Sequence, residues 1–321
     1  MRTILVAVDF SSCSRDVINV AAALAQRQKA SLILAHVVGT PPLEAPVLPV
    51  GVTGQEVSTV SSAEAELARD ASEIRRRGIN VETRVVVGPA SKTIAAMTEE
   101  LGVGLVVMGT HGRKGAAHLF LGSVAEHVVR SVSCPVMVTP DGTAPDLARW
   151  EGTEPLRMLV ATDGSLAGEA ALAWAGSFTR SNQCDLTLLR LYWPWEELVR
   201  YGLDDIWEER PRDREVLLAL ERDVKLQAGT LTGTVLSRLR LRAAGQHNTQ
   251  TIVEEVLLSG SDVLVVGIPK HRSGLRVIIA PKNVLRSCPI PVLCVPQALV
   301  SLVSRPQSPE ILPRPAAASQ G

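Results

Sequence analysis

Residues 3–11 read TILVAVDFS, and residues 157–165 read RMLVATDGS. Each is a short apolar run that ends in Asp and, two residues later, in Ser. Two later pairs repeat the similarity in the same order: VGLVVMG (103–109) with SDVLVVG (261–267), and VSCPVMVTP (132–140) with CPIPVLCVP (288–296). The offsets are 154, 158 and 156 residues. Three matched anchors at nearly constant spacing indicate that the 321-residue chain is a tandem duplication.

Each copy alternates strands and helices. Continuous runs of Val, Ile and Leu are typical of strands buried on both faces of a parallel sheet, and helical apolar spacing separates them. The predicted strands are 3–9, 31–38, 81–87, 103–109 and 135–138, then 157–162, 185–192, 234–241, 262–266 and 291–295. The predicted fold class is α/β, with two tandem doubly wound domains, each a five-stranded parallel sheet with helices on both faces.

The domains are expected at residues 1–140 and 156–297. A linker (141–155) separates them, and a tail (298–321) has the composition of a disordered end. Residues 39–60 are rich in Pro and Gly and predict a loop without a regular element. An insertion (193–211) carries aromatic and acidic residues, and is either a packing lid on the second copy or a partner site.

Composition argues against several classes of protein. Lys plus Arg and Asp plus Glu both number 33, and aromatic residues make up 3%. A nucleic-acid-binding protein usually has a basic excess, and a single-strand binder needs stacking aromatics. The N-terminus does not resemble a signal peptide, and no apolar run reaches the ~18 residues of a membrane span. We therefore expect a cytoplasmic protein without membrane insertion.

The five scattered cysteines predict no metal site.

A glycine-rich segment follows the fourth strand of the first copy. It reads Gly109-Thr110-His111-Gly112-Arg113-Lys114-Gly115, and nine residues separate Gly112 from Gly122-Ser123. Ligands of open α/β sheets bind beyond the carboxyl ends of the strands. Glycines let backbone N–H groups approach a phosphate, and a helix N-terminus favours an anion. On spacing alone, phosphate binding and simple turn formation are equally open. No catalytic triad or carboxylate pair converges here, so no catalytic residue is assigned.

These residues resemble the universal stress protein family, whose ATP-binding members carry Gly, two residues, Gly, nine residues, then Gly-Ser or Gly-Thr. Gly109, Gly112, Gly122 and Ser123 fit that motif without a gap. The matching context is VAVDFS, LAHV, VMGTHGR and SCPVMV, and the resemblance covers nearly all of both copies. It implies an adenine nucleotide alpha-hydrolase-like fold and an ATP ligand, with Mg as an optional companion.

The resemblance also implies a set of site residues. Asp9 would accept hydrogen bonds from the ribose hydroxyls, although it could instead anchor the start of its own helix. The backbone of Val37 would meet the edge of the adenine. The phosphate loop and its flanks would be Met108, Gly109, Gly112, Arg113, Gly122, Ser123 and Val124.

The second copy departs from the motif. Gly267 remains, but Lys270 stands at the second glycine. Counting forward puts Ala280-Pro281 at the Gly-Ser pair, whereas counting back from the final helix puts Ile278-Ile279 there. On either count the anion-binding pair is lost, so we expect only the first copy to bind ATP.

The resemblance favours an ATP-binding regulatory protein of the stress response. The alternatives are a slow ATPase or self-phosphorylating protein, with Ser123 and Thr110 as the nearest hydroxyls, and a nucleotide-independent scaffold. Family members pair through their last strands, here 135–138 and 291–294. The two copies would then form an internal pseudo-dimer, with a further homodimer as another option; otherwise these are terminal strands without a partner.

Overall fold

The computed structural model describes residues 3–39, 54–110, 121–142, 145–203, 213–232, 238–270 and 279–302. The first copy contains β1 (Thr3–Ala7), α1 (Ser14–Gln28), β2 (Ser31–Val38), α2 (Gly54–Arg76), β3 (Val81–Val87), α3 (Ala90–Glu100), β4 (Leu105–Gly109), α4 (Ser123–Ser131) and β5 (Val136–Thr139). The second contains β6 (Leu156–Thr162), α6 (Leu166–Ser181), β7 (Cys184–Tyr192), α7 (Pro194–Arg200), α8 (Asp213–Thr232), β8 (Arg238–Ala243), α9 (Asn248–Ser259), β9 (Val263–Ile268), α10 (Pro281–Ser287) and β10 (Val292–Pro296). The α/β prediction is confirmed.

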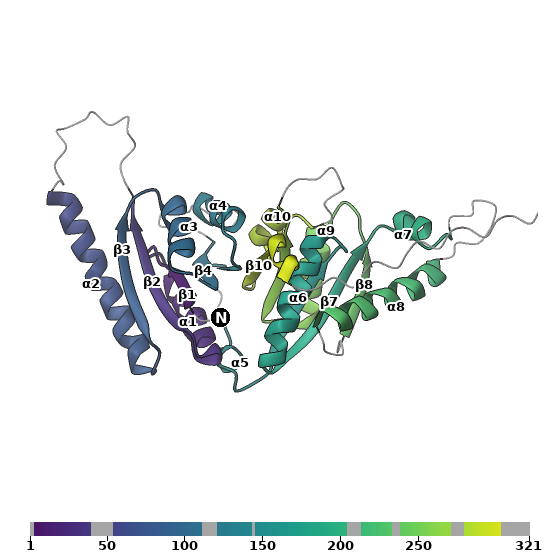
Figure 1. Cartoon of the computed structure of the whole chain (residues 1–321), viewed down its shortest axis with the longest axis horizontal. Coiled ribbons are helices and arrows are strands. Elements are labelled where there is room, and N and C mark those ends of the chain that lie inside the picture. Colours follow the sequence, from purple (N-terminus) through teal and green to yellow (C-terminus); the bar gives the residue numbers. More distant parts are fainter. Residues whose placement is uncertain are drawn as a thin grey trace, which may run out of the picture.

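All ten strands belong to one sheet, in the order β3-β2-β1-β4-β5-β10-β9-β6-β7-β8. Pairing is parallel within each copy and antiparallel where β5 meets β10, with Met137 opposite Leu293. We call this β5–β10 pair the seam. It lies at the centre of the molecule, with α2 and α8 at opposite ends (Figure 1). The repeat is visible in the register: Leu5 of β1 pairs with Val106, and its equivalent Leu159 pairs with Leu264.

Two hydrophobic layers cover the two faces of the sheet, and each runs through both copies. One layer packs α1, α2, α6 and α8 against a face that includes Met137 and Leu293. The other packs α3, α4, α9 and α10 against a face that includes Val136 and Cys294. The seam therefore joins two cores as well as two sheets.

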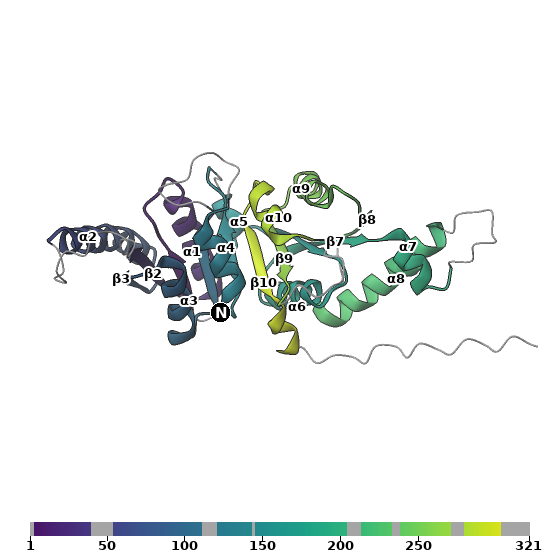
Figure 2. The ribbon, with the colours of Figure 1, turned by 90° about the horizontal axis from the view of Figure 1, so that it is seen from above.

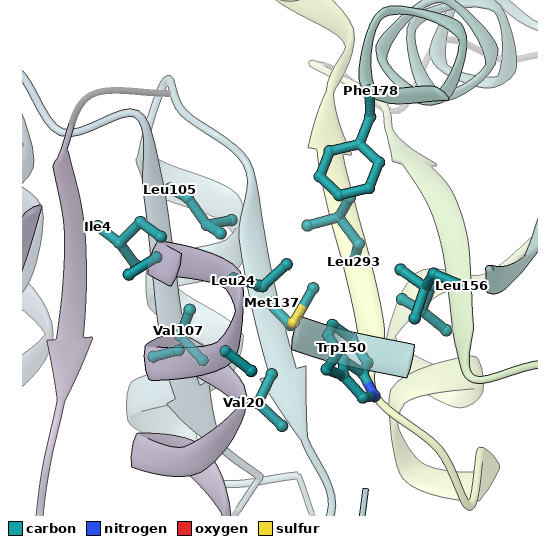
Figure 3. Packing of buried hydrophobic residues seen from close by; sticks show 14 of the residues in the cluster. Ile4, Val20, Leu24, Leu105, Val107, Met137, Trp150, Leu156, Phe178 and Leu293 are labelled. Carbon is teal, nitrogen blue, oxygen red and sulfur yellow. The ribbon is translucent and has the colours of Figure 1, made fainter. Parts of the chain in front are cut away.

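The segment between the copies contains a short helix, α5 (Leu147–Glu151), which packs against α1. Its Trp150 is 1% exposed. Figure 3 shows the indole between Leu24 and Met137 of the first copy and Leu156 and Leu293 of the second. The void left among these side chains is only about 10 Å³. Trp150 of the connecting segment is therefore part of the shared core.

Arg27 at the end of α1 adds polar contacts beside this core. Its guanidinium donates to the carbonyl of Arg149 at 2.6 Å, to Asn182 Oδ1 at 3.2 Å and to the carbonyl of Gln183. It also lies over the ring of Phe178, 5.9 Å from the centroid. One side chain of the first copy thus binds α5 and the end of α6.

Three segments differ from expectation. Helix α2 begins at Gly54, so the last part of the segment expected to be a loop is helical. Part of the 193–211 insertion forms α7. Residues expected to begin the tail at 298 belong to a 3-10 helix, η1 (Gln297–Leu302), whose Leu299 and Val300 pack on the core. Short helices are missed because they carry too few residues to show a hydrophobic period.

Replacing Trp150 with Ala tests the shared core. We expect Trp150→Ala to lower the free energy of unfolding by about 3–5 kcal/mol, because removing a buried indole leaves a cavity. Trp195→Ala is the matched control, since Trp195 is 62% exposed; a surface substitution changes stability by about 0.5 kcal/mol or less. Urea unfolding of the full chain compares the two. Equal destabilisation by both variants would contradict this role for Trp150.

Candidate functional site

The first copy brings the ends of three strands together. Strand β1 lies between β2 and β4. From β1 the chain adds β2 and β3 on one side and then β4 and β5 on the other, so the strand order reverses between β1 and β4. In open α/β sheets this switch point forms the ligand crevice. Ala7 pairs with both Ala35 and Met108. Parallel register therefore puts Asp9, Val37 and Gly109 at the same edge of the sheet.

Asp9 is held by hydrogen bonds within its own loop. Its Oδ1 accepts from Ser11 N at 3.1 Å, Ser11 Oγ at 2.6 Å and Ser14 Oγ at 3.0 Å. Ser14 is the first residue of α1, so Asp9 does anchor this helix start. All three bonds fall on Oδ1. The anchoring role and a role for Oδ2 toward a ligand are therefore compatible.

The glycine-rich segment starts and ends at one place. Thr110 N donates to Thr139 O at 3.1 Å, and Gly122 N donates to Thr110 O at 2.7 Å. The N-terminus of α4 is thus fixed beside the end of β4, although residues 111–121 lie between them in sequence. No side chain of a described residue caps α4. Its first N–H groups are the donors that an anion prefers.

The other predicted site residues have different environments. Ser123 is exposed at the start of α4, and Val124 is half-buried against the core. Met108 is buried, and Val37 is half-buried opposite Val86 of β3. The structure therefore brings Asp9, Val37, Met108, Gly109, Gly122, Ser123 and Val124 to one end of the first copy. Gly112 and Arg113 lie outside the described residues.

Sequence reasoning missed Phe10 and His36 at this edge. The two rings lie 4.5 Å apart, and His36 Nδ1 is 2.7 Å from the carbonyl of Val8. Phe10 has φ 57°, a left-handed conformation that is costly for a bulky residue. Its equivalent at offset 154 is Gly164, with φ 77°. The sequence does show one sign of this difference, because VDFS (8–11) has Phe where TDGS (162–165) has Gly.

The second copy fills the corresponding space with a buried ion pair. Arg190 is the equivalent of His36, and its guanidinium lies against Gly164. A Cβ on Gly164 would be 1.9 Å from Arg190 Nη1, so a side chain like that of Phe10 fits only if the guanidinium of Arg190 moves away. Arg190 Nη2 donates to Glu197 Oε1 at 3.2 Å, and both side chains are 7% exposed. Glu197 comes from α7, so this part of the insertion packs onto the second copy.

The end of β9 and the start of α10 also differ from the first copy. A Cβ on Gly267 would lie 1.9 Å from the carbonyl oxygen of Ala167, so this glycine permits close helix packing. The backward count fits the structure, because the buried pair Val128-Val129 of α4 and the buried pair Val284-Leu285 of α10 are also 156 residues apart. Ile279, 7% exposed, therefore stands at the position of Ser123. Helix α10 begins two residues later, at Pro281, which offers no N–H donor.

Two cavities lie near the first copy's edge strands and helices. One of about 410 Å³ lies between β3 and α3, with Arg84, Lys92 and Met97 in its wall. Another of about 190 Å³ opens between α1 and α2, beside Phe10 and Ser11. None of the predicted site residues within the described ranges lines either cavity.

Among the described residues, no three or more His, Cys, Asp or Glu side chains gather in a way that could hold a metal ion. None of the described helices has the length and apolar character needed to cross a bilayer.

Comparison with known proteins identifies the family. The model of the Universal stress protein family matches residues 1–140 and 156–296. Universal stress protein YxiE of Bacillus subtilis is 30% identical over 145 residues, which cover 42% of this chain and 95% of that protein. Universal stress protein Sll1388 of Synechocystis sp. is 27% identical over 146 residues, again 42% of this chain and 95% of that protein. A solved universal stress protein from Archaeoglobus fulgidus has a TM-score of 0.64 at 18% identity, and the match covers 92% of this chain and 96% of that one. The chain belongs to the universal stress protein family, as a tandem member with two copies of its domain.

Proposed function

We propose that the first copy binds an adenine nucleotide, ATP in the first instance, and that the protein is a regulatory nucleotide sensor of the stress response. The observation that carries this proposal is the Gly122 N–H···O=C Thr110 bond of 2.7 Å. It fixes the uncapped N-terminus of α4 beside the end of β4, at the switch point of the sheet. Backbone donors are then aimed at the position where a phosphate would lie.

The site residues take complementary roles in this proposal. Asp9 accepts from the ribose hydroxyls through Oδ2, while Oδ1 holds the loop. The backbone at Val37 meets the adenine. Gly109, Gly122 and Ser123 contact the phosphates, between Met108 and Val124, with Gly112 and Arg113 contributing from the intervening loop. Mg would bind through the phosphates, since no protein cluster for a metal occurs among the described residues.

Nucleotide binding by the first copy alone is supported by the side chains that occupy the corresponding site of the second copy. Ile279 is apolar and buried at the position of Ser123, and Pro281 offers no N–H donor. The Arg190–Glu197 pair occupies the space beside Gly164. A nucleotide would have to displace a buried ion pair there without gaining a phosphate cradle.

The second copy instead acts as a built-in dimer partner. Its last strand pairs antiparallel with that of the first copy, and both hydrophobic layers continue through the seam. We therefore propose that the two copies form an internal pseudo-dimer within one chain.

Changing Gly122 and Ser123 together tests the nucleotide site. Gly122 has φ −62°, so Ala fits its backbone, and Pro is favoured at the first helical position. We expect Gly122→Ala/Ser123→Pro to weaken ATP binding by about 10- to 100-fold, because a hydrogen bond to a charged group contributes about 1.5–3 kcal/mol. Calorimetry on the wild-type chain should give a stoichiometry of about one ATP.

Ser131→Ala, at the other end of α4, is the control and should bind as the wild type does. Unchanged ATP affinity in the double variant would refute the site assignment. Two equal sites per chain would refute binding by the first copy alone. A wild-type chain that binds no nucleotide would favour the scaffold alternative.

The ion pair of the second copy gives a separate prediction. Arg190→Met should lower the free energy of unfolding by about 3 kcal/mol, because it leaves the buried Glu197 carboxylate with only the exposed Arg200, 3.5 Å from Oε2, as a cationic partner. Arg190→Met/Glu197→Met should recover most of that loss. Urea unfolding measures both. Lys225→Met removes one partner of the exposed Lys225–Glu221 pair and should cost about 1 kcal/mol or less. A double variant no more stable than Arg190→Met would contradict this account.

A further inference from the structure

An ion pair joins the two copies next to the proposed phosphate site. Helices α4 and α10 lie on either side of the seam (Figures 1 and 2). Lys282 Nζ, from α10, lies 2.7 Å from both Oε1 and Oε2 of Glu126, from α4. The carboxylate of the first copy is thus held by a cation of the second.

Glu126 and Lys282 occupy equivalent positions. They are 156 residues apart, the same offset that relates Met137 to Leu293. Met137 and Leu293 face each other across the seam, so the pseudo-twofold axis that relates the copies passes between them. Two first copies paired in this way would bring Glu126 against another Glu126. The cation is available only because the partner is the unlike second copy.

Glu126 lies one helical turn from the proposed phosphate site. It is the fourth residue of α4, and its N–H donates to the carbonyl of Gly122 at 3.0 Å. A free carboxylate at this distance would repel a triphosphate. The hydrogen bond from Lys282 is the largest of the effects that hold the pKa of Glu126 below its usual value, and the charges of Arg130 and Arg286 act in the same direction. Glu126 is therefore ionised at neutral pH, and among these three cations Lys282 contributes most to balancing its charge.

We propose that Lys282 of the second copy neutralises Glu126 and thereby sets the affinity of the first copy for the nucleotide phosphates. This inference rests on the proposed function. It gives the second copy, which lacks a phosphate cradle of its own, an electrostatic role in nucleotide binding by the first. Nucleotide affinity would then report whether the two copies are correctly paired.

The test uses ATP titrations of the full chain in low salt with three variants. Lys282→Gln should weaken ATP binding by about fivefold, because it exposes the charge of Glu126 to the phosphates. Glu126→Gln should bind at least as tightly as the wild type. Glu126→Gln/Lys282→Gln should return to within about twofold of the wild type. If the pair acted only by holding the copies together, Glu126→Gln would weaken binding as much as Lys282→Gln, and the double variant would not recover.

Two controls isolate the charge effect. Adenosine, which has no phosphate, should bind the wild type and Lys282→Gln equally. Lys225→Gln, which breaks the distant Lys225–Glu221 pair of α8, should leave ATP affinity unchanged. The effect of Lys282→Gln should also shrink as salt screens the charges.

The outcomes separate this inference from the function on which it rests. A wild-type chain that binds ATP with an affinity indifferent to Lys282→Gln overturns the inference alone, as does equal weakening by Glu126→Gln. A wild-type chain that binds no ATP overturns the proposed function and the inference together.

Discussion

The antiparallel pairing of β5 with β10 is the interaction on which the rest of the structure depends. Each strand would otherwise be an open sheet edge, with unpaired N–H and C=O groups. Pairing Met137 with Leu293 joins two five-stranded sheets and makes both hydrophobic layers continuous. It also brings α4 beside α10, and it leaves a space on the face of the sheet covered by α1 and α6 that Trp150 fills. The contacts between the copies therefore follow from one strand pair, and Arg27 and the connecting helix consolidate it.

The two copies share a backbone plan and fill it differently at the carboxyl ends of their strands. Phe10 keeps a left-handed backbone at a cost of about 1–3 kcal/mol, and its ring packs against that of His36 at a tilt of 33°. The second copy has Gly164 there, which adopts the same conformation freely, and Arg190 takes the vacated space. Its ion pair with Glu197 leaves Arg190 Nε without a hydrogen-bond partner among the described residues. Such a pair is weak evidence for stability, and it is strong evidence that this space is occupied by the protein itself.

The sequence predicted what depends on local pattern. The bounds of β2 and β3 match the predicted 31–38 and 81–87, because each contains a continuous run of apolar residues. Helices α5 and α7 have five and seven residues and show no period, so they were missed. The meeting of Asp9, Val37 and Gly109 follows from parallel topology alone. The Phe10–His36 and Arg190–Glu197 contacts depend on how particular side chains pack, which a single sequence does not reveal.

Duplication within one chain removes a constraint that a homodimer cannot escape. In a symmetric dimer, a residue near the twofold axis meets its own copy, so a charged residue there faces a like charge. Met137 and Leu293 avoid this problem because both are uncharged, and either side chain could also lie against a copy of itself across the axis. Glu126 and Lys282 show what fusion permits, because equivalent positions have taken opposite charges and bind each other at 2.7 Å. Under the proposed function, the same second copy that lacks the phosphate cradle supplies Lys282, so a copy that does not bind the ligand itself can still serve the copy that does.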